Sequence, residues 1–248
     1  MWVRDHRVLI TGGSAGIGLA LAHAFLERGN QVLAVSRSIE RLKAATERLP
    51  RLQTATCDVA NESDLRQLVS VAQERLGGLS ILVNNAGIQR NDVYATTATD
   101  TLLQHVSEEI DTNFTGLVKL TALALPLLQQ AREAAIVNVS SVLALAPKQS
   151  APVYCATKSA VRAFTTALRY QMEDTAPHVR VVEVLPPMVD TDMTRGRSGT
   201  KLSPEAVAEA VLDGLAADRS EIQVGLTRTF ARLQRLSPAL AARRVRRR

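Results

Sequence analysis

The chain has 248 residues, of which 46% are hydrophobic and 22% charged, proportions that suit one folded α/β domain with a full apolar core. Its net charge of +6 comes from residues 228–248, which hold eight arginines and no acidic residue, so residues 1–227 carry a charge of −2. A weakly acidic body with only 3% aromatic residues argues against a nucleic-acid-binding protein.

The chain begins with the pattern of a strand, a glycine-rich turn and a helix. Residues 7–10 (RVLI) predict a strand, the turn TGGSAGIG follows at once, and residues 19–28 predict a helix that ends at Gly29. Glycines permit a tight turn and the close approach of phosphates, and the N–H groups of a helix start attract anions. The spacing is not G-x-G-x-x-G, so the strand–turn–helix context carries the prediction of a pyrophosphate site.

The second predicted strand, residues 31–35, ends in Ser36 and Arg37. In a dinucleotide-binding fold an acidic residue at this position holds the ribose hydroxyls of NAD. A neutral serine followed by a basic arginine instead suits the 2′-phosphate of NADP, through charge-assisted hydrogen bonds. We therefore expect NADP(H) to be preferred over NAD(H). The alternative is that Arg37 is simply a solvated loop residue.

Helices and strands then alternate along the chain. The sequence predicts helices over residues 39–49, about 62–76 and about 100–130, the last interrupted near Pro126, and strands that end at Asp58 and over residues 81–83. This order is typical of a Rossmann-type doubly wound parallel sheet with helices on both faces, whose ligands lie beyond the carboxyl ends of the strands. Thr11, Asp58 and Asn84 fall at such ends.

The second half of the chain continues the alternation. An apolar strand over residues 135–139 leads into Ser140 and Ser141, and later segments predict a helix after Tyr154, a strand over residues 179–185, a helix over 203–217 and a strand over 222–224. We predict a single domain over residues 1–248. The polar loop at about residues 188–201 is a candidate mobile lid, and residues 228–248 form a basic tail.

Tyr154 and Lys158 form the pair on which the functional prediction depends. Residues four apart lie on one face of a helix, so the phenol and the ammonium can face the same site. An adjacent ammonium is expected to lower the pKa of the phenol toward the range useful for general acid–base catalysis. A serine at the end of a buried strand, Ser141, can bind a substrate oxygen beside it. Taken alone, a Tyr-x-x-x-Lys helix is more often a packed aromatic with a solvated lysine.

Taken together, the motifs resemble those of the short-chain dehydrogenase/reductase family, and residues 85–90 and 151–158 resemble its DltE-like branch of oxidoreductases. The matches run in family order: Thr11-Gly12-x-x-x-Gly16-x-Gly18, Asp58, Asn84-Asn85-Ala86-Gly87, Asn113, Ser141, Tyr154-x-x-x-Lys158 and Pro186-x-x-Val189-x-Thr191. One departure is Pro187, which stands where the family usually has glycine. Proline fixes φ and lacks an N–H group, so the chain there is expected to follow a different path.

The resemblance implies an NAD(P)(H)-dependent carbonyl reductase or alcohol dehydrogenase. Tyr154 is implied as the proton donor and acceptor, Lys158 as the residue that lowers its pKa and binds the nicotinamide ribose, Ser141 as the residue that orients the substrate, and Asn113 as part of a water relay to Lys158. The implied cofactor contacts are Thr11, Gly12, Ser14, Gly16, Ile17, Gly18, Ser36, Arg37, Asp58, Val59, Asn84, Asn85, Ala86, Gly87, Tyr154, Lys158, Pro186, Val189 and Thr191.

The sequence also suggests which molecules the protein binds and where it is located. We expect a small or medium apolar carbonyl or alcohol substrate, no bound metal and no nucleic acid, and the resemblance implies a homodimer or homotetramer. The absence of a long apolar run or signal peptide, with only Cys57 and Cys155, indicates a cytoplasmic protein. Two alternatives remain open: a catalytically weak cofactor-sensing regulator, and a protein that binds a membrane or partner through its arginine-rich tail, for which membrane contact is the less favoured mode.

Overall fold

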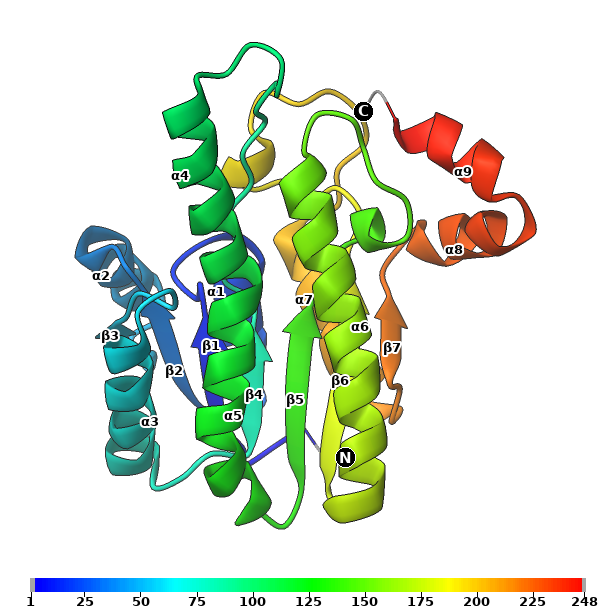
Figure 1. Ribbon diagram of the computed structural model, residues 1–248. Helices are drawn as coiled ribbons and strands as arrows, with labels where there is room; N and C mark the ends of the chain where they lie inside the picture. Colours follow the sequence, from blue (N-terminus) through cyan, green and yellow to red (C-terminus); the bar gives the residue numbers. More distant parts are fainter. Residues whose placement is uncertain (1–2, 247–248) are drawn as a thin grey trace.

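The computed structural model describes residues 3–246 and is built around a parallel sheet (Figure 1). Within the described residues the sheet has seven strands in the order β3-β2-β1-β4-β5-β6-β7. The strands are β1 (Arg7–Thr11), β2 (Gln31–Ser36), β3 (Gln53–Thr56), β4 (Ile81–Asn84), β5 (Ala134–Val139), β6 (Val179–Leu185) and β7 (Glu221–Gln223). Every neighbouring pair is parallel, so all the carboxyl ends meet at one edge. The predicted doubly wound sheet is confirmed.

Helices cover both faces of this sheet. One face is covered by α1 (Gly16–Glu27), α2 (Ile39–Arg48) and α7 (Pro204–Ala216), and the other by α3 (Glu62–Leu76), α5 (Gly116–Gln129) and α6 (Pro152–Thr175). Three further helices, α4 (Thr99–Ile110), α8 (Thr227–Leu236) and α9 (Pro238–Val245), lie toward the carboxyl edge of the strands (Figure 1). The chain order reverses between β1 and β4, and ligands of doubly wound folds bind at such a switch point.

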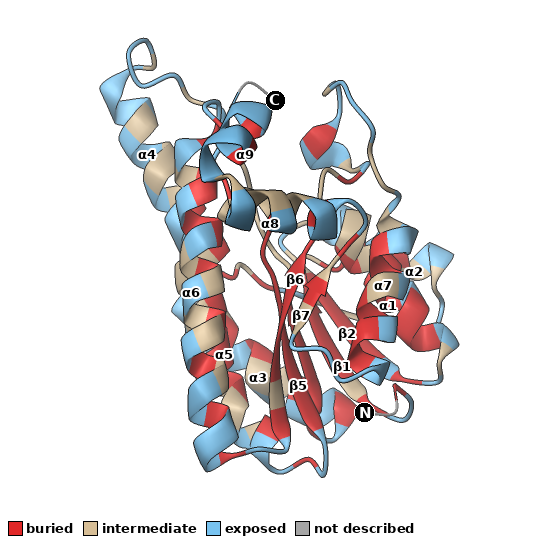
Figure 2. Ribbon diagram, turned by 90° about the vertical axis from the view of Figure 1, so that its right-hand side faces the viewer, coloured by how far each residue is buried: buried red, intermediate tan, exposed pale blue. Residues whose placement is uncertain are grey.

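The central strands β1, β2, β4, β5 and β6 are buried on both faces, as strands within a parallel sheet must be, and their sequences are mostly apolar. Successive residues of a strand point to opposite faces, so Val8 and Ile10 of β1 pack with α1 and α7, whereas Leu9 packs with α3 and α5. Figure 2 shows this arrangement: the central strands are buried along most of their length, and the helices mainly on the side that faces the sheet. A rigid layer therefore fixes the positions of all the strand ends.

The break in the long helical region lies elsewhere than predicted. Pro126 lies inside α5, three residues before its end at Gln129, whereas a five-residue π-helical turn, Asp111–Thr115, separates α4 from α5. A proline so near the end of a helix removes a single hydrogen bond of the last turns, so the helix continues through it. The π-helical turn holds Asn113, and such turns are often found at functional sites.

The basic tail folds against its own chain. Helices α8 and α9 bury Ala231, Ala241 and Val245. Gln234 Nε2 donates to the backbone oxygen of Leu145 at 2.8 Å, and the backbone N–H of Gln149 donates to the backbone oxygen of Arg246 at 3.0 Å. The last two arginines of the predicted tail, residues 247 and 248, lie outside the described residues.

No helix within residues 3–246 has the length and apolarity needed to cross a bilayer.

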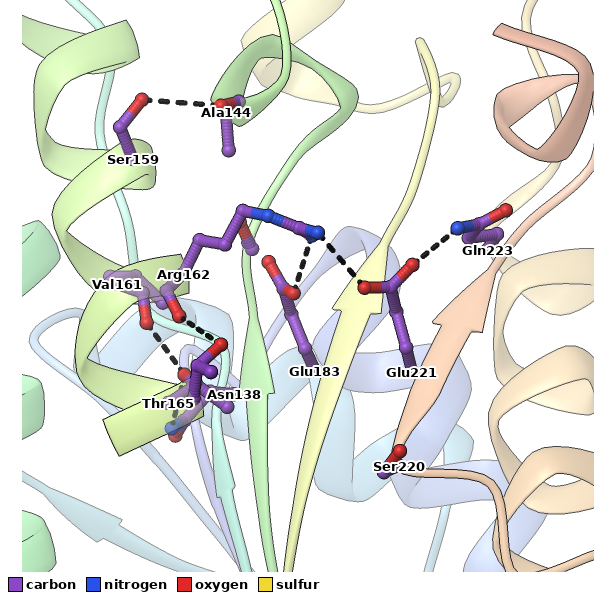
Figure 3. Close-up of polar contacts among 12 residues, drawn as sticks. Asn138, Ala144, Ser159, Val161, Arg162, Thr165, Glu183, Ser220, Glu221 and Gln223 are labelled. Carbon is purple, nitrogen blue, oxygen red and sulfur yellow. Dashed lines mark hydrogen bonds and ion pairs between the residues drawn. The ribbon is translucent and has the colours of Figure 1, made fainter. Parts of the chain in front are cut away.

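A charged cluster lies between α6 and strands β6 and β7 (Figure 3). Arg162 Nη1 donates to Glu183 Oε2 at 2.7 Å, and its Nη2 donates to Glu221 Oε2 at 3.0 Å. Glu183 is only 1% exposed. Burial raises the pKa of the Glu183 carboxyl to about 7, although Arg162 acts in the opposite direction.

Glu183→Gln is expected to stabilise the protein progressively, relative to wild type, as the pH rises from about 5 to 8. The pKa of Glu183 is about 7 in the folded chain and about 4.3 unfolded, so the stability due to its protonated form is present below pH ~4 and lost as the pH rises through 7. The difference between the two pKa values corresponds to about 4 kcal/mol over the whole titration. Urea unfolding at both pH values measures it, with exposed Glu47→Gln as control. A stability difference that does not change with pH would contradict the assignment.

Candidate active site

Three of the residues predicted to act in catalysis meet beside the end of β5. Tyr154 and Lys158 lie in the first turns of α6, and Ser141 follows β5 directly. Ser141 lies near enough to Tyr154 to act on the pKa of its phenol, and the Ser141 Oγ accepts from the N–H of Leu143 at 3.1 Å. The Lys158 ammonium donates to Val139 O at 2.8 Å and lies 5.7 Å from the centre of the Tyr154 ring. The predicted shared face of the helix is therefore present.

The sequence predicts that Lys158 lowers the pKa of the Tyr154 phenol, but in the structure this pKa is raised. Burial raises the pKa of Tyr154 to about 12, and Ser141 opposes this only in part. Burial also lowers the pKa of Lys158 to about 8. The two residues are 8% and 4% exposed, so the low polarity around them disfavours phenolate and ammonium alike. Tyr154 therefore keeps its proton throughout the neutral range, as a proton donor must.

Asn113 joins this group from the π-helical turn. Its Oδ1 accepts from the N–H of Ile88 at 2.8 Å, and its Nδ2 donates to Ile88 O at 2.9 Å and to Thr157 Oγ1 at 3.2 Å. Gly87 lies between Asn113 and Lys158: a Cβ atom on Gly87 would lie 3.3 Å from Asn113 Oδ1 and 3.6 Å from Lys158 Nζ. The structure thus gathers the four predicted catalytic residues, and Asn113 holds the chain after β4 against α6.

The glycine-rich turn is braced by residues that follow β4. Asn85 Nδ2 donates to Thr11 O at 3.0 Å and to Gly12 O at 3.2 Å, while Thr11 Oγ1 accepts from the N–H groups of Asn85 and Ala86, both at 3.0 Å. A Cβ atom on Gly18 would lie 2.2 Å from Gly12 O. The turn is therefore packed too closely to admit any side chain at Gly18.

This turn fits a dinucleotide pyrophosphate. The residue before α1, Ala15, has no side chain to cap the helix, and the first turn of α1 holds no acidic residue. The N–H groups of the helix start therefore have no side-chain acceptor, and they and the helix dipole favour an anion. Ser14 and Ile17 lie in the same segment. Within the described residues, this is where the pyrophosphate of a dinucleotide would be held.

The residues predicted to bind the adenosine half lie at the ends of β2 and β3. Arg37 Nη1 lies 4.0 Å from Asp58 Oδ2, and the Arg37 side chain is 59% exposed. Ser36 ends β2, Asp58 Oδ1 accepts from the N–H of Ala60 at 3.0 Å, and Val59 is buried. Arg37 is thus held only loosely and is free to turn toward a phosphate.

Asn84 does not join the predicted cofactor contacts through its side chain. Its amide nitrogen donates to Thr121 Oγ1 at 3.1 Å and to Asn138 Oδ1 at 2.9 Å, and the residue is 3% exposed. Asn138 in turn donates to Thr165 Oγ1 at 3.0 Å (Figure 3). This buried network ties β4 and β5 to α5 and α6. A polar Asn138 within an apolar strand was the sequence signal that could have revealed it.

The loop after β6 borders the glycine-rich turn. Pro186 O accepts from the N–H of Val142 at 3.0 Å, and Val189 is 4% exposed and forms a β-bridge with Leu202. Thr191 lies close to the turn, since a Cβ atom on Gly16 would lie 2.9 Å from its Cγ2. The end of β6 and the end of β1 are therefore brought together, as a dinucleotide that spans the sheet edge requires.

Comparisons with known proteins agree with this geometry. The family model described as short chain dehydrogenase matches residues 6–201. The uncharacterized oxidoreductase DltE of Bacillus subtilis (strain 168) is 43% identical over 228 residues, which cover 90% of this chain and 89% of the relative.

Solved structures with the same fold extend the comparison. A short chain dehydrogenase of Burkholderia cenocepacia J2315, in complex with NADP, is 28% identical with a TM-score of 0.85, and the match covers 99% of both chains. A short chain dehydrogenase/reductase of Burkholderia phymatum, in complex with NAD, has a TM-score of 0.86 over 97% of this chain and 96% of its own, but at 20% identity it supports the fold alone.

Proposed function

Because the chain belongs to the short-chain dehydrogenase/reductase family, in its DltE-like branch, and is thus an NAD(P)-dependent oxidoreductase, we propose that it acts as an NADPH-dependent carbonyl reductase. The reverse reaction is the oxidation of an alcohol. The observation that carries the proposal is the placement of the buried Tyr154 beside Lys158, with the Lys158 ammonium 5.7 Å from the Tyr154 ring centre and Ser141 acting on the same phenol, at the carboxyl edge of the sheet. A small-molecule carbonyl compound is the proposed substrate.

Tyr154 and Ser141 act on the substrate oxygen. When bound, the nicotinamide supplies the hydride that the carbonyl carbon accepts. The two hydroxyls polarise the carbonyl, and Tyr154 gives its proton to the oxygen as negative charge develops there. A pKa of about 12 keeps this proton in place at neutral pH until the substrate oxygen becomes more basic than the phenol. Lys158, whose pKa is about 8, is charged at neutral pH and stabilises the phenolate that remains.

The chain's own contacts support a dinucleotide across the switch point. The glycine-rich turn and the start of α1 would hold the pyrophosphate, while Asp58 and Val59 would border the adenine. Asn85, Ala86 and Gly87 would line the middle of the cofactor, and Pro186, Val189 and Thr191 the nicotinamide end. For Asn84 only the backbone is available, because its side chain is bonded inside the core.

Arg37→Ala is expected to lower the preference for NADPH over NADH by about tenfold or more, because a charge-assisted hydrogen bond to the 2′-phosphate is lost. The exposed guanidinium at the end of β2, next to Ser36, motivates this proposal. The measurement is the ratio of kcat/KM for the two cofactors. Arg48→Ala, at the far end of α2, removes the same charge as a control. An unchanged ratio in Arg37→Ala would defeat the assignment of this arginine to the 2′-phosphate.

We also propose a homodimer or homotetramer in the cytoplasm. The helices that carry Asn113 and Tyr154 are exposed on their outer faces, where Leu103 is 61% and Tyr170 also 61% exposed. Apolar surface of this kind favours association between copies. Both cysteines are unpaired and buried, which fits a reducing compartment. Sedimentation velocity measures the oligomeric state.

The test of the proposed function is a panel of ketones, aldehydes and quinones incubated with NADPH, with loss of NADPH absorbance as the readout. Turnover of any member supports the reductase. A protein that binds NADPH tightly but reduces no member would instead fit a cofactor-sensing regulator. Membrane or partner binding by the tail is tested by deleting residues 228–248. Because α8 and α9 pack on the chain, the deletion is compared with wild type for thermal stability as well.

A further inference from the structure

Lys148 is a buried lysine that lacks a counter-ion. It is 7% exposed, in the loop that precedes α6. Its backbone N–H donates to Cys155 Sγ at 3.4 Å, so the loop is held against the residue next to Tyr154. Among residues 3–246, no carboxylate or carbonyl oxygen pairs with the Lys148 ammonium. The ammonium nitrogen itself is not fully enclosed, so it remains accessible to a ligand of opposite charge.

Arg197 places a second positive charge at the same location. It belongs to the loop after β6, and its Nη1 donates to a neutral group, Gln89 Oε1, at 3.1 Å. The positive charge of Arg197 acts on two nearby groups. Together with burial it lowers the pKa of Lys148, and it also acts to lower the pKa of Tyr154. The two loops also contact residues next to the catalytic groups, because Lys148 is bonded to Cys155, beside Tyr154, and Arg197 to Gln89, beside the residue that Asn113 binds.

The acidic groups nearby do not neutralise this pair. Glu109 is buried, and its Oε1 accepts from the backbone N–H of Arg90 at 2.9 Å; burial raises the pKa of its carboxyl, and this hydrogen bond acts in the opposite direction. In the loop after β6, Asp190 pairs with Lys201 at 3.2 Å and Asp192 with Arg195 at 2.5 Å. Each carboxylate is thus already engaged.

The other side chains around the site are paired in the same way. His105 bonds with Asp92 at 3.0 Å, and Glu108 pairs with Arg90 at 2.6 Å. Cys155, whose pKa burial raises, stays a neutral thiol. The positive charge of Lys148 and Arg197 is therefore not compensated by the described groups that face them.

The folded tail brings further positive charge to this end of the molecule. Helix α9, with Arg243 and Arg244 in its last turn, lies at the carboxyl edge of the sheet (Figure 1). The backbone contact between Gln149 and Arg246, at 3.0 Å, fixes α9 beside the loop that carries Lys148. Charges of one sign around a site raise the local concentration of ligands of the opposite sign.

We propose that Lys148 and Arg197 together bind an anionic group, a carboxylate or a phosphate, carried by the carbonyl substrate. The inference rests on the proposed reductase function, and it replaces the apolar substrate expected from the sequence with an acidic one. An anion there would supply the counter-ion that both side chains lack, and it would position the carbonyl group of the same molecule toward Tyr154. Sequence reasoning did not single out either residue, because their loops meet only in the folded chain.

The test compares acids with matched neutral compounds. Calorimetric titrations of the chain, alone and saturated with NADP⁺, use levulinate against methyl levulinate for the carboxylate, and dihydroxyacetone phosphate against dihydroxyacetone for the phosphate. We expect at least one acid to bind about tenfold or more tightly than its neutral partner, and the preference to be lost in Lys148→Gln and in Arg197→Gln. Arg195→Gln, on the same loop with its side chain 82% exposed, is the matched control and should keep the preference.

The outcomes separate this proposal from the reductase function. Binding of NADP⁺ with no preference for either acid overturns the anion site and leaves the reductase standing. Preference for an acid without any binding of NADP⁺ supports the anion site and contradicts the reductase. A preference that persists in Arg197→Gln, whose partly exposed position puts the fold at little risk, or that disappears equally in Arg195→Gln, also overturns the assignment.

Discussion

Replacement of Tyr154 by phenylalanine is expected to lower kcat/KM for carbonyl reduction by about 10²- to 10⁴-fold, the range associated with loss of a general acid. The variant removes only the hydroxyl, so the ring still packs beside Lys158 at the start of α6. With the hydroxyl absent, Ser141 alone remains to polarise the carbonyl, and no group is placed to give the oxygen its proton. The proposed pyrophosphate and 2′-phosphate contacts are left intact, so most of the loss should appear in the chemical step and not in the affinity for NADPH.

A matched control lies on the same helix. Tyr170 lies in the same helix, α6, about three turns after Lys158, and is 61% exposed. Tyr170→Phe therefore removes an equivalent hydroxyl far from the carboxyl edge of the sheet. Its reductase activity should equal that of wild type. Turnover of Tyr154→Phe at the wild-type rate, with the same NADPH affinity, would show that another group donates the proton.

Gly18→Ala is expected to abolish measurable NADPH binding and to destabilise the fold. A Cβ atom at this position would lie 2.2 Å from Gly12 O and 2.6 Å from Asn85 Nδ2, so the backbone of the turn must shift. Overpacking of this kind costs about 1–3 kcal/mol of stability. The shift displaces the N–H groups that are proposed to bind the pyrophosphate, and we expect NADPH affinity to fall by about 100-fold or more.

The control for this variant separates stability from binding. Gly29 follows α1 with φ +79°, and no described atom lies within 4 Å of a Cβ built there. Gly29→Ala therefore strains the backbone without a clash, and it should lower the melting temperature while NADPH affinity stays at the wild-type value. If Gly18→Ala binds NADPH as wild type does, the turn is not the pyrophosphate site.

The sheet could be predicted from the sequence because it depends on local apolar runs. The helix at residues 62–76 and the strand at 179–185 have the predicted bounds. Both are delimited by short-range signals: Asn61 caps the start of the helix and Gly77 ends it in a left-handed conformation. Four valines and a leucine, interrupted by Arg180 and Glu183, mark the strand. Parallel pairing then places the strand ends at one edge without further information.

Features that depend on contacts between distant segments could not be predicted. The π-helical turn at Asp111–Thr115 is held by the bonds of Asn113 to Ile88 and Thr157, whereas Pro126 had suggested a break on local grounds. The pKa of Tyr154 depends on how deeply α6 and the strand end bury it, which spacing alone does not report. Asn84 matched a family motif, but its side-chain amide donates to Asn138 on the neighbouring strand, a contact that the motif does not reveal.

The most direct measurement of the central claim is a calorimetric titration of the wild-type chain with NADPH and with NADH. We predict one dinucleotide bound per chain, with NADPH the tighter of the two, because the glycine-rich turn, Arg37 and the loop after β6 are proposed to bind its pyrophosphate, its 2′-phosphate and its nicotinamide end. A chain that binds neither dinucleotide would contradict this prediction, since carbonyl reduction needs a hydride from the cofactor as well as the proton from Tyr154.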